Sequence, residues 1–176
     1  MSLALFVGRF QPYHLGHLAA TKWILEREKR LIIGIGSAQY SYTYENPFTA
    51  GERVEMILAA LEEEGLASRC VIIPIPDVEQ HAIWVQHVKQ YCPPFSRVYS
   101  NSPLVRRLFV EAGIEVREIP LFERDKYDAT YIRKLMIEGA DWEKYVPRPV
   151  ARVIKRIGGV ERLREIVTKS DKLSQQ

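Results

Sequence analysis

The 176-residue chain has only two cysteines, and they form neither a Cys-x-x-Cys pair nor a cluster with histidine. Isolated cysteines such as Cys70 and Cys92 are typical of reduced, packed thiols in a cytosolic protein. No apolar run approaches the roughly 18 residues of a spanning helix. The start, Met1 to Arg9, has no basic region before its apolar stretch, and that stretch is too short for a signal peptide. We therefore expect a cytoplasmic protein with no disulfide framework and no membrane span.

Charge of one sign is lacking as well. The 25 Lys and Arg residues are nearly offset by 22 Asp and Glu, which leaves a formal net charge of +3. So small an excess disfavours a general nucleic-acid binder, because binding to phosphate backbones needs a broad basic surface. Hydrophobic residues make up 47% of the chain and charged residues 27%, which excludes a disordered or fibrous protein. If the protein handles anions, its positive charge must be local.

Two common nucleotide-binding motifs are also absent. No Gly-x-x-x-x-Gly-Lys-Ser/Thr loop occurs anywhere, which argues against a P-loop kinase or ATPase. The segment from Gly34 to Gln39 lacks the third glycine of a dinucleotide fingerprint, and it follows the second predicted strand instead of the first. Any nucleotide site must therefore use a different motif.

The apolar pattern alternates between short blocks and longer amphipathic stretches. Short blocks predict strands at 4–8, 31–37, 70–75, 97–100 and 114–119. Helices are predicted from His17 to about Arg30, from the Thr49 cap to Gly65, at 81–91 and 103–112, and through most of the chain beyond Asp128. This order predicts an α/β fold, a Rossmann-like parallel sheet of about five strands with helices on both faces and a helical C-terminal segment.

The length fits one domain. We assign it to residues 1–168, with its helical part from about 128, and expect the polar stretch 169–176 to fray. No internal repeat and no linker rich in Gly, Ser or Pro divides the chain. Ligands of such sheets bind beyond the carboxyl ends of the strands, so we expect the site residues to follow the strands directly.

The first strand is followed by Gly-Arg-Phe-Gln-Pro-Tyr-His-Leu-Gly-His, residues 8–17. Gly8 permits close approach of a ligand, and Gly16 lets a phosphate reach the amide groups of a helix start. His14 and His17 are three residues apart, which predicts that they share one face of a helical turn. With Arg9 they form a compact set of donors for a polyphosphate. Two histidines could also begin a metal site, but no cysteine or acidic residue within the motif completes one.

A second motif opens the helix after the fifth strand. Residues 127–133 read Tyr-Asp-Ala-Thr-Tyr-Ile-Arg, so Thr130 and Arg133 lie on one face of the first turns. By themselves a threonine and an arginine near a helix start are ordinary, and the first motif gives them meaning. The segment from Phe48 to Arg53 leaves two interpretations open: Arg53 is either a ligand contact or a structural ion-pair partner behind a capped helix start.

The first motif resembles the HxGH signature of the nucleotidylyltransferase superfamily, and its longer form, Gly-Arg-Phe-Gln-Pro-x-His-x-Gly-His, resembles the archaeal-type nicotinamide-nucleotide adenylyltransferases. The second motif is similar to the superfamily's Ile-Ser-x-Thr-x-x-Arg sequence. One departure is Asp128, which stands where the family usually has serine. Both residues cap helices, but a carboxylate beside a triphosphate repels it, so direct phosphate contact by position 128 is not expected.

The resemblance implies a role for each candidate site residue. The implied ATP-binding residues are Gly8, Arg9, Phe10, His14, Gly16, His17, Thr130 and Arg133, of which His14, His17 and Arg133 are the catalytic candidates. The implied mononucleotide-binding residues are Ser37, Gln39, Asp77, Trp84 and Asn101. A helical tryptophan is most often a packing residue, but an indole face also suits a cationic pyridinium ring, which makes Trp84 the best candidate for the base.

The reaction implied is ATP plus nicotinamide mononucleotide giving NAD and pyrophosphate, with Mg²⁺ carried by ATP and no dedicated side-chain cage for the metal. The resemblance further implies a homo-oligomer, often a hexamer, and the small net charge and the lack of a long apolar run predict that neither nucleic acid nor a membrane is a partner. One alternative is an adenylyl- or cytidylyltransferase acting on flavin or pantetheine phosphate, and another is a catalytically silent nucleotide-sensing module. The Phe48–Arg53 segment and Trp84 favour the pyridine nucleotide.

Overall fold

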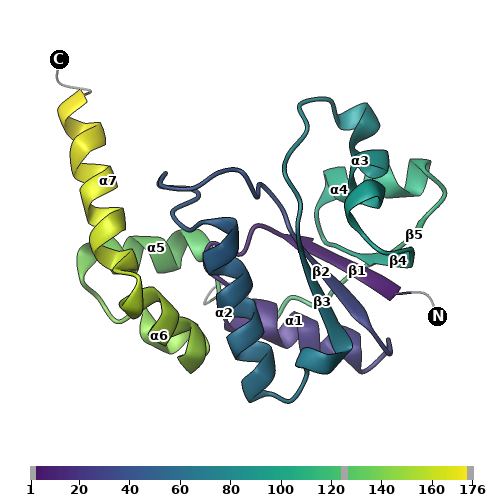
Figure 1. Ribbon diagram of the computed structural model, residues 1–176, viewed down its shortest axis with the longest axis horizontal. Coiled ribbons are helices and arrows are strands. Elements are labelled where there is room, and N and C mark those ends of the chain that lie inside the picture. The colour runs from purple at the N-terminus through teal and green to yellow at the C-terminus, as the bar shows by residue number, and fades with distance from the viewer. Residues whose placement is uncertain (1–2, 124–126, 174–176) are drawn as a thin grey trace.

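A computed structural model describes residues 3–123 and 127–173 of the chain. Its centre is a five-stranded sheet in which every pair of neighbours is parallel, in the order β3-β2-β1-β4-β5 (Figure 1). The strands are β1 (Leu3–Gly8), β2 (Leu31–Ile35), β3 (Cys70–Pro74), β4 (Phe95–Tyr99) and β5 (Glu115–Arg117). The predicted fold is confirmed. Because β1 lies between β2 and β4, the chain reverses its winding direction beside β1, and ligands of such sheets bind at that point.

Helices cover both faces of this sheet. They are α1 (Leu15–Leu25), α2 (Ala50–Glu63), α3 (Trp84–Tyr91), α4 (Pro103–Glu111), α5 (Ala129–Glu138), α6 (Arg148–Arg156) and α7 (Gly159–Leu173), with short 3-10 turns at Ala67–Arg69, His81–Ile83 and Glu143–Tyr145. Successive side chains of β1 point to opposite faces of the sheet, and each face is covered by its own layer of helices. Ala4 and Phe6 face the core shared with α1, α2 and the C-terminal helices, whereas Leu3 and Leu5 face the smaller core under α3 and α4.

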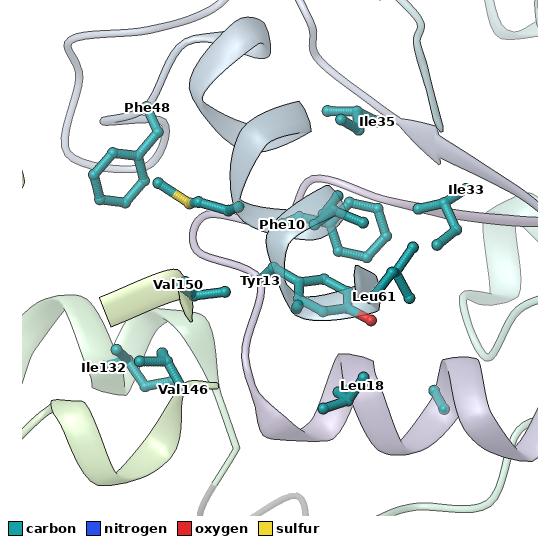
Figure 2. Packing of buried hydrophobic residues seen from close by; sticks show 14 of the residues in the cluster. Phe10, Tyr13, Leu18, Ile33, Ile35, Phe48, Leu61, Ile132, Val146 and Val150 are labelled. Atoms are coloured by element: carbon teal, nitrogen blue, oxygen red, sulfur yellow. The ribbon is translucent and has the colours of Figure 1, made fainter. Parts of the chain in front are cut away.

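The helical C-terminal part packs beside the first half of the sheet domain, where α6 lies against α2 and α7 packs on α5 and α6 (Figure 1). Its apolar residues join the main core. Figure 2 shows Ile132, Val146 and Val150 in the same buried cluster as Phe10 and Phe48, which come from the first third of the sequence. The single predicted domain thus has one continuous main core that includes its helical part.

Several predicted boundaries were wrong. The first helix begins at Leu15 instead of His17, and it ends at Leu25 instead of Arg30. Its early end has a visible cause, since the Arg69 guanidinium donates to the carbonyls of Leu25, Glu28 and Lys29 and holds the chain as it turns into β2. The strands also differ slightly from the predicted ranges: β1 and β4 begin two residues or fewer earlier, and β2 to β5 end one or two residues earlier.

The predicted tail needs correction too. Helix α7 continues to Leu173, so residues 169–173 are helical, and residues 174–176 lie outside the described part of the chain. No glycine or proline interrupts the sequence after Gly159, and Glu, Arg, Leu and Lys extend a helix readily once it has begun.

Cys70 and Cys92 are free, partly buried thiols, and burial raises the pKa of each to about 11. Across residues 3–123 and 127–173, no helix has both the length and the apolar character needed to cross a membrane. Within the same ranges, His, Cys, Asp and Glu side chains form no group of three or more able to hold a metal ion.

Candidate active site

The two motif histidines form a reciprocal cap at the start of α1. His14 is the N-cap residue, and its Nδ1 accepts a hydrogen bond of 3.3 Å from the His17 backbone amide. In return, Nδ1 of His17 accepts a bond of 3.1 Å from the His14 amide. The rings stack with centroids 3.6 Å apart. This is the geometry of a capping box, with histidine in the places that Ser or Thr and Glu usually take. The helix therefore starts earlier than predicted, and the two rings meet at its N-terminal end instead of along one helical face.

The cap fixes the protonation of both rings. Because each Nδ1 accepts a hydrogen bond, the single proton of each neutral ring lies on Nε2, which remains available as a donor. Burial lowers the pKa of His14 to about 4. Burial, with the neighbouring His14 ring as a smaller cause, holds the pKa of His17 well below its ordinary value. Near neutral pH the pair is therefore two uncharged N–H donors.

Both motif glycines are required by close contacts. A Cβ on Gly16 would come within 2.8 Å of the Tyr127 Cβ and 2.9 Å of His14 Cε1. A Cβ on Gly8 would meet the ring of Phe10 at 2.9 Å. Phe10 itself has φ of 53°, a backbone conformation that favours glycine, and its ring is buried edge-on against His17. The loop after β1 is thus tightly built around the two histidines.

Arg133 reaches the same loop from α5. Its side chain is 4% exposed, Nη1 donates to the Gln11 carbonyl at 2.9 Å, and Nη2 donates to Thr130 Oγ1 at 3.3 Å. Its Nε is buried and has no hydrogen-bond partner among the described residues. Burial lowers the pKa of this guanidinium. A buried N–H without a partner is costly, and the Arg133 side chain also lines a cavity.

That cavity, of about 300 Å³, brings both motifs together; we call it the triphosphate cavity. It is lined by Arg9, Phe10, Gln11, His14, His17, Glu45, Tyr127, Asp128, Ala129, Thr130 and Arg133. The Asp128 side chain caps α5, because its Oδ1 accepts from the Thr130 amide at 2.8 Å. Six of the eight predicted ATP-binding residues line this cavity, and Gly8 and Gly16 lie at its supporting turns.

A second cavity, of about 510 Å³, lies beyond the ends of β2 and β3; we call it the Trp84 cavity. Its lining includes Gln39, Asp77 and Trp84, with Tyr40 and Leu104 on its walls. Asp77 is tied to Ser37, whose amide and hydroxyl donate to the two carboxylate oxygens at 3.2 and 2.7 Å. Gln39 Oε1 accepts from the Asp77 amide at 2.9 Å. The structure therefore brings four of the five predicted mononucleotide-binding residues together.

Asn101, the fifth, lies apart from the others. It lines a third cavity of about 380 Å³, together with His14, His17 and the segment 119–122. Both ends of its side chain are engaged with Ile119, since Nδ2 donates to the Ile119 carbonyl and Oδ1 accepts from the Ile119 amide. Asn101 thus shapes the loop after β5 on the histidine side of the site.

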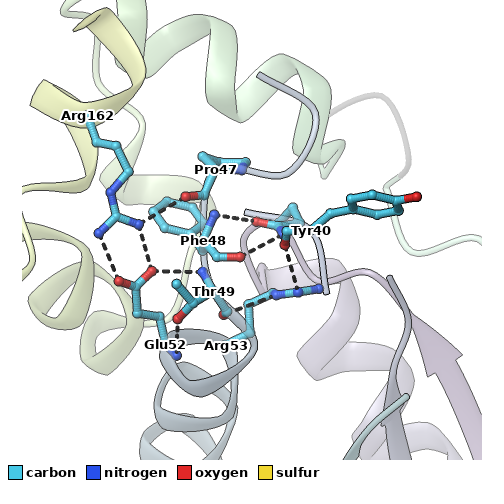
Figure 3. Close-up of polar contacts among 8 residues, drawn as sticks. Tyr40, Pro47, Phe48, Thr49, Glu52, Arg53 and Arg162 are labelled. Carbon is cyan, nitrogen blue, oxygen red and sulfur yellow. Dashed lines mark hydrogen bonds and ion pairs between the residues drawn. The ribbon is translucent and has the colours of Figure 1, made fainter. Parts of the chain in front are cut away.

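Arg53 is structural, with carbonyl partners and not the predicted ion pair. Its side chain is fully buried, and its five hydrogen bonds all end on backbone carbonyls, those of Arg9, Gly36, Ser37, Tyr40 and Thr49. Figure 3 shows it beneath Tyr40 and Thr49. One guanidinium therefore fixes the loops that leave β1 and β2. These loops contribute residues to the triphosphate cavity and to the Trp84 cavity, respectively. Burial lowers its pKa to about 10.

The sequence did not single out three residues that the site uses. Gln11 pairs with the backbone of Phe48 in both directions, Nε2 to the carbonyl and Oε1 from the amide, each at 3.0 Å. Tyr127 packs over His14, with ring centroids 6.4 Å apart, and Glu45 lines the triphosphate cavity. Gln11 and Tyr127 lie inside the two motifs, so their positions were a usable signal. Glu45 lies in a loop with no motif-level signal for it.

Comparison with known proteins gives consistent results. Residues 5–135 match the cytidylyltransferase-like family. The nicotinamide-nucleotide adenylyltransferase of Methanothrix thermoacetophila is 53% identical over 169 residues, which cover 96% of this chain and 98% of that protein. The enzyme of the same name from Ignicoccus hospitalis is 56% identical over 165 residues, covering 93% of this chain and 96% of that protein.

Solved structures share the fold. A bifunctional NMN adenylyltransferase/ADP ribose pyrophosphatase from Francisella tularensis, complexed with AMP and a manganese ion, superposes with a TM-score of 0.79 at 23% identity. The match covers 99% of this chain and 54% of that chain, so this chain spans about half of the bifunctional protein. A putative nicotinate-nucleotide adenylyltransferase from Vibrio parahaemolyticus gives a TM-score of 0.63 at 19% identity, covering 94% of this chain and 97% of that one.

Proposed function

The chain belongs to the cytidylyltransferase-like family, among its nicotinamide-nucleotide adenylyltransferases, and from this premise we propose that it transfers the adenylyl group of ATP to nicotinamide mononucleotide. The products are NAD and pyrophosphate. The observation that carries the proposal is the triphosphate cavity, which two neutral histidine donors and the side chain of Arg133 line together.

The nucleophile is the 5′-phosphate of the mononucleotide, which attacks the α-phosphate of ATP in line. A phosphate monoester loses its second proton near pH 6, judging by phosphorylated side chains, so it is mostly a dianion at neutral pH. No general base is required. The reaction depends instead on positioning of the two phosphates and on electrostatic stabilisation of the transition state.

The donors divide this work between them. The Nε2–H groups of His14 and His17 donate to the α- and β-phosphate oxygens. Because both rings are neutral, they do so without a change in their protonation state. Arg9 and Arg133 carry the positive charge toward the triphosphate, and Thr130 adds a hydroxyl beside Arg133. As negative charge moves onto the departing pyrophosphate, these fixed donors hold it.

A divalent cation fits this arrangement. Glu45 lines the cavity, and its carboxylate is the kind of hard oxygen ligand that Mg²⁺ prefers. Asp128 Oδ1 is already held by the Thr130 amide, so Glu45 is the carboxylate best able to contact the ion. Mg²⁺ that arrives with ATP would neutralise phosphate charge. The bound manganese of the Francisella structure supports divalent metal use.

The Trp84 cavity is the proposed mononucleotide site. Trp84 packs edge-on against Phe109, with ring centroids 5.3 Å apart, so its orientation is fixed before any ligand binds. A cationic pyridinium over an indole face gains about 0.5–2 kcal/mol. The Asp77 carboxylate, held by Ser37, is an acceptor for ribose hydroxyls in the same cavity. Asn101 contributes from the histidine side.

We also propose a cytoplasmic homo-oligomer, of the hexameric kind that the family resemblance implied, with no nucleic acid or membrane among its partners. Ile83 supports an assembly, because it is 47% exposed although it is large and apolar. Light scattering after size exclusion tests this, and a monomer at micromolar concentration would contradict it.

His17→Ala tests the proposed chemistry. Loss of one transition-state donor lowers kcat by at least about 10²-fold. His17→Gln is the matched control for folding, because glutamine suits the third position of a capping box. We expect both variants to melt cooperatively and both to lose turnover. Near-normal turnover in His17→Ala would refute the assignment of His17.

A further inference from the structure

Arg162 connects the last helix to the loop that precedes α2. Its Nη1 and Nη2 donate to the two carboxylate oxygens of Glu52 at 2.7 and 2.8 Å, and Nη1 also donates to the Pro47 carbonyl at 2.9 Å (Figure 3). The guanidinium lies over the Tyr42 ring, 4.2 Å from its centroid. The side chains of Arg162 and Glu52 are only 12% and 17% exposed. This is a bidentate, sheltered pair, unlike a surface ion pair that contributes little.

Glu52 completes a second capping box beneath this pair. Its Oε2 accepts from the Thr49 amide at 2.9 Å, and its own amide donates to Thr49 Oγ1 at 3.1 Å. Burial acts to raise the pKa of Glu52, but hydrogen bonds from Arg162 and from the Thr49 backbone outweigh it and lower the pKa. The carboxylate therefore stays charged and holds Arg162 near neutral pH.

The loop held in this way reaches the triphosphate cavity. Phe48, between Pro47 and Thr49, makes the two hydrogen bonds to Gln11, and the Gln11 carbonyl accepts from Arg133. Tyr44 of the same loop lies under the Arg133 guanidinium, 5.4 Å from ring centroid to Cζ. A short series of direct contacts thus links Arg162 to the phosphate donors, although Arg162 does not line the triphosphate cavity.

We propose that Arg162 is a positioning residue for adenylyl transfer: through Glu52 and Pro47 it fixes the loop at residues 42–49, and with it the Gln11–Arg133 side of the triphosphate cavity. The inference rests on the proposed function. It assigns a role in the reaction to α7, none of whose side chains up to residue 169 lines either substrate cavity.

Arg162→Ala and Arg156→Ala form a matched pair of variants. Arg156, on α6, also pairs with a glutamate of α2, Glu55, but both side chains are about half exposed. Arg162→Ala is expected to lower kcat by at least about 10-fold and to raise KM for ATP, while KM for the mononucleotide stays within about twofold. Arg156→Ala is expected to leave all three constants within about twofold. Unchanged constants in folded Arg162→Ala would overturn the proposal, as would an equal loss in Arg156→Ala.

Two further measurements separate positioning from general stability and from the proposed function. Arg162→Lys keeps a positive charge beside Glu52 but loses the bidentate contact, so its kcat should lie between those of the wild type and Arg162→Ala. If Arg162→Ala does not fold, the kcat of Arg162→Lys is the deciding measurement. A wild-type kcat in Arg162→Lys would overturn the proposal. Hydrogen exchange needs no turnover. Peptides covering residues 42–49 should exchange faster in Arg162→Lys while β1 stays protected, whatever reaction the wild type performs. Unchanged exchange there would contradict the positioning role.

Discussion

At the scale of single residues, the two histidines show how local capping prepares a reactive group. The Nδ1 atoms of His14 and His17 each accept a hydrogen bond from the other residue's backbone amide, which leaves Nε2–H as the only donor of each neutral ring. The feature that holds the helix start therefore also selects the tautomer. Mutation of either ring affects both folding and chemistry, and the tests must separate the two.

The low histidine pKa values predict a pH dependence of stability. The unfolded His14 takes up a proton near pH 6.5, whereas the folded one does so only near pH 4. Between these values the unfolded state binds more protons, so stability is lost as pH falls from 6.5 toward 4. His14→Asn keeps an N-cap without titrating. Its melting temperature should fall less steeply over this range than that of the wild type, although His17 still contributes. Equal slopes in thermal melts at pH 7, 6 and 5 would contradict this explanation.

Arg53 yields a second prediction at this scale. Lysine has one ammonium group and cannot reach the five carbonyls that Arg53 bonds from a buried position. Since each orphaned buried acceptor costs about 1–3 kcal/mol, Arg53→Lys should lower the free energy of unfolding by at least about 3 kcal/mol. Arg107→Lys, at an exposed pair with Glu111, is the control and should change it by less than about 0.5 kcal/mol. Urea denaturation measures both, and equal midpoints would refute the role of Arg53.

At the scale of elements, the start of α5 shows where the sequence motif and the geometry agree. Asp128 caps the helix through the Thr130 amide, as a serine would, and its carboxylate borders the triphosphate cavity. The cap explains how aspartate is accepted at this position. It also predicts a cost, because a negative charge faces the phosphates.

Asp128→Ser should therefore keep the stability of the wild type and lower KM for ATP, by about twofold or more. Asp128→Ala removes the cap as well, and should lose about 0.5–2 kcal/mol of unfolding free energy. Steady-state kinetics and urea denaturation on the two variants separate charge from capping. A higher KM for ATP in Asp128→Ser would show that the carboxylate assists binding.

The contact between α7 and the 42–49 loop gives another element-scale prediction. A Cβ on Gly159 would lie 2.8 Å from Phe48 Cε1 and 3.0 Å from Ile154 Cγ2. Gly159→Ala should therefore cost about 1–3 kcal/mol by overpacking, although alanine is the better helix former. Gly51→Ala is the control, since its Cβ would meet only Thr49 Oγ1 at 4.0 Å. Thermal melts compare the two, and a stabilised Gly159→Ala variant would contradict the packing.

The elements also show what the sequence could and could not predict. Apolar periodicity predicted all five strands in order, because buried parallel strands are short and β-branched. It misplaced the end of α1, since the Arg69 contacts that hold the turn there come from 40 residues away. It placed His14 on a helical face because histidine is not an expected cap. The sequence also left the role of Arg53 open, because its partners are backbone carbonyls of loops whose paths are defined only in the folded chain.

At the scale of the whole molecule, the small net charge of +3 is compatible with strong local attraction for phosphate. Arg9 and Arg133 border one cavity, while several other arginines pair with carboxylates, as Arg97 does with Glu28 and Glu115. The two cavities open at the carboxyl ends of the strands and share the loops that Arg53 fixes. The fold thus prepares two neighbouring sites for two nucleotides.

The most direct test is a product assay with purified protein, ATP, Mg²⁺ and a panel of phosphate acceptors. The panel holds nicotinamide mononucleotide, nicotinic acid mononucleotide, flavin mononucleotide and phosphopantetheine, and His17→Ala serves as the control for contaminating activity. We predict that nicotinamide mononucleotide gives NAD and pyrophosphate in equal amounts, and that the flavin and pantetheine phosphates give no adenylylated product. Conversion of either of those two acceptors without formation of NAD would contradict the account.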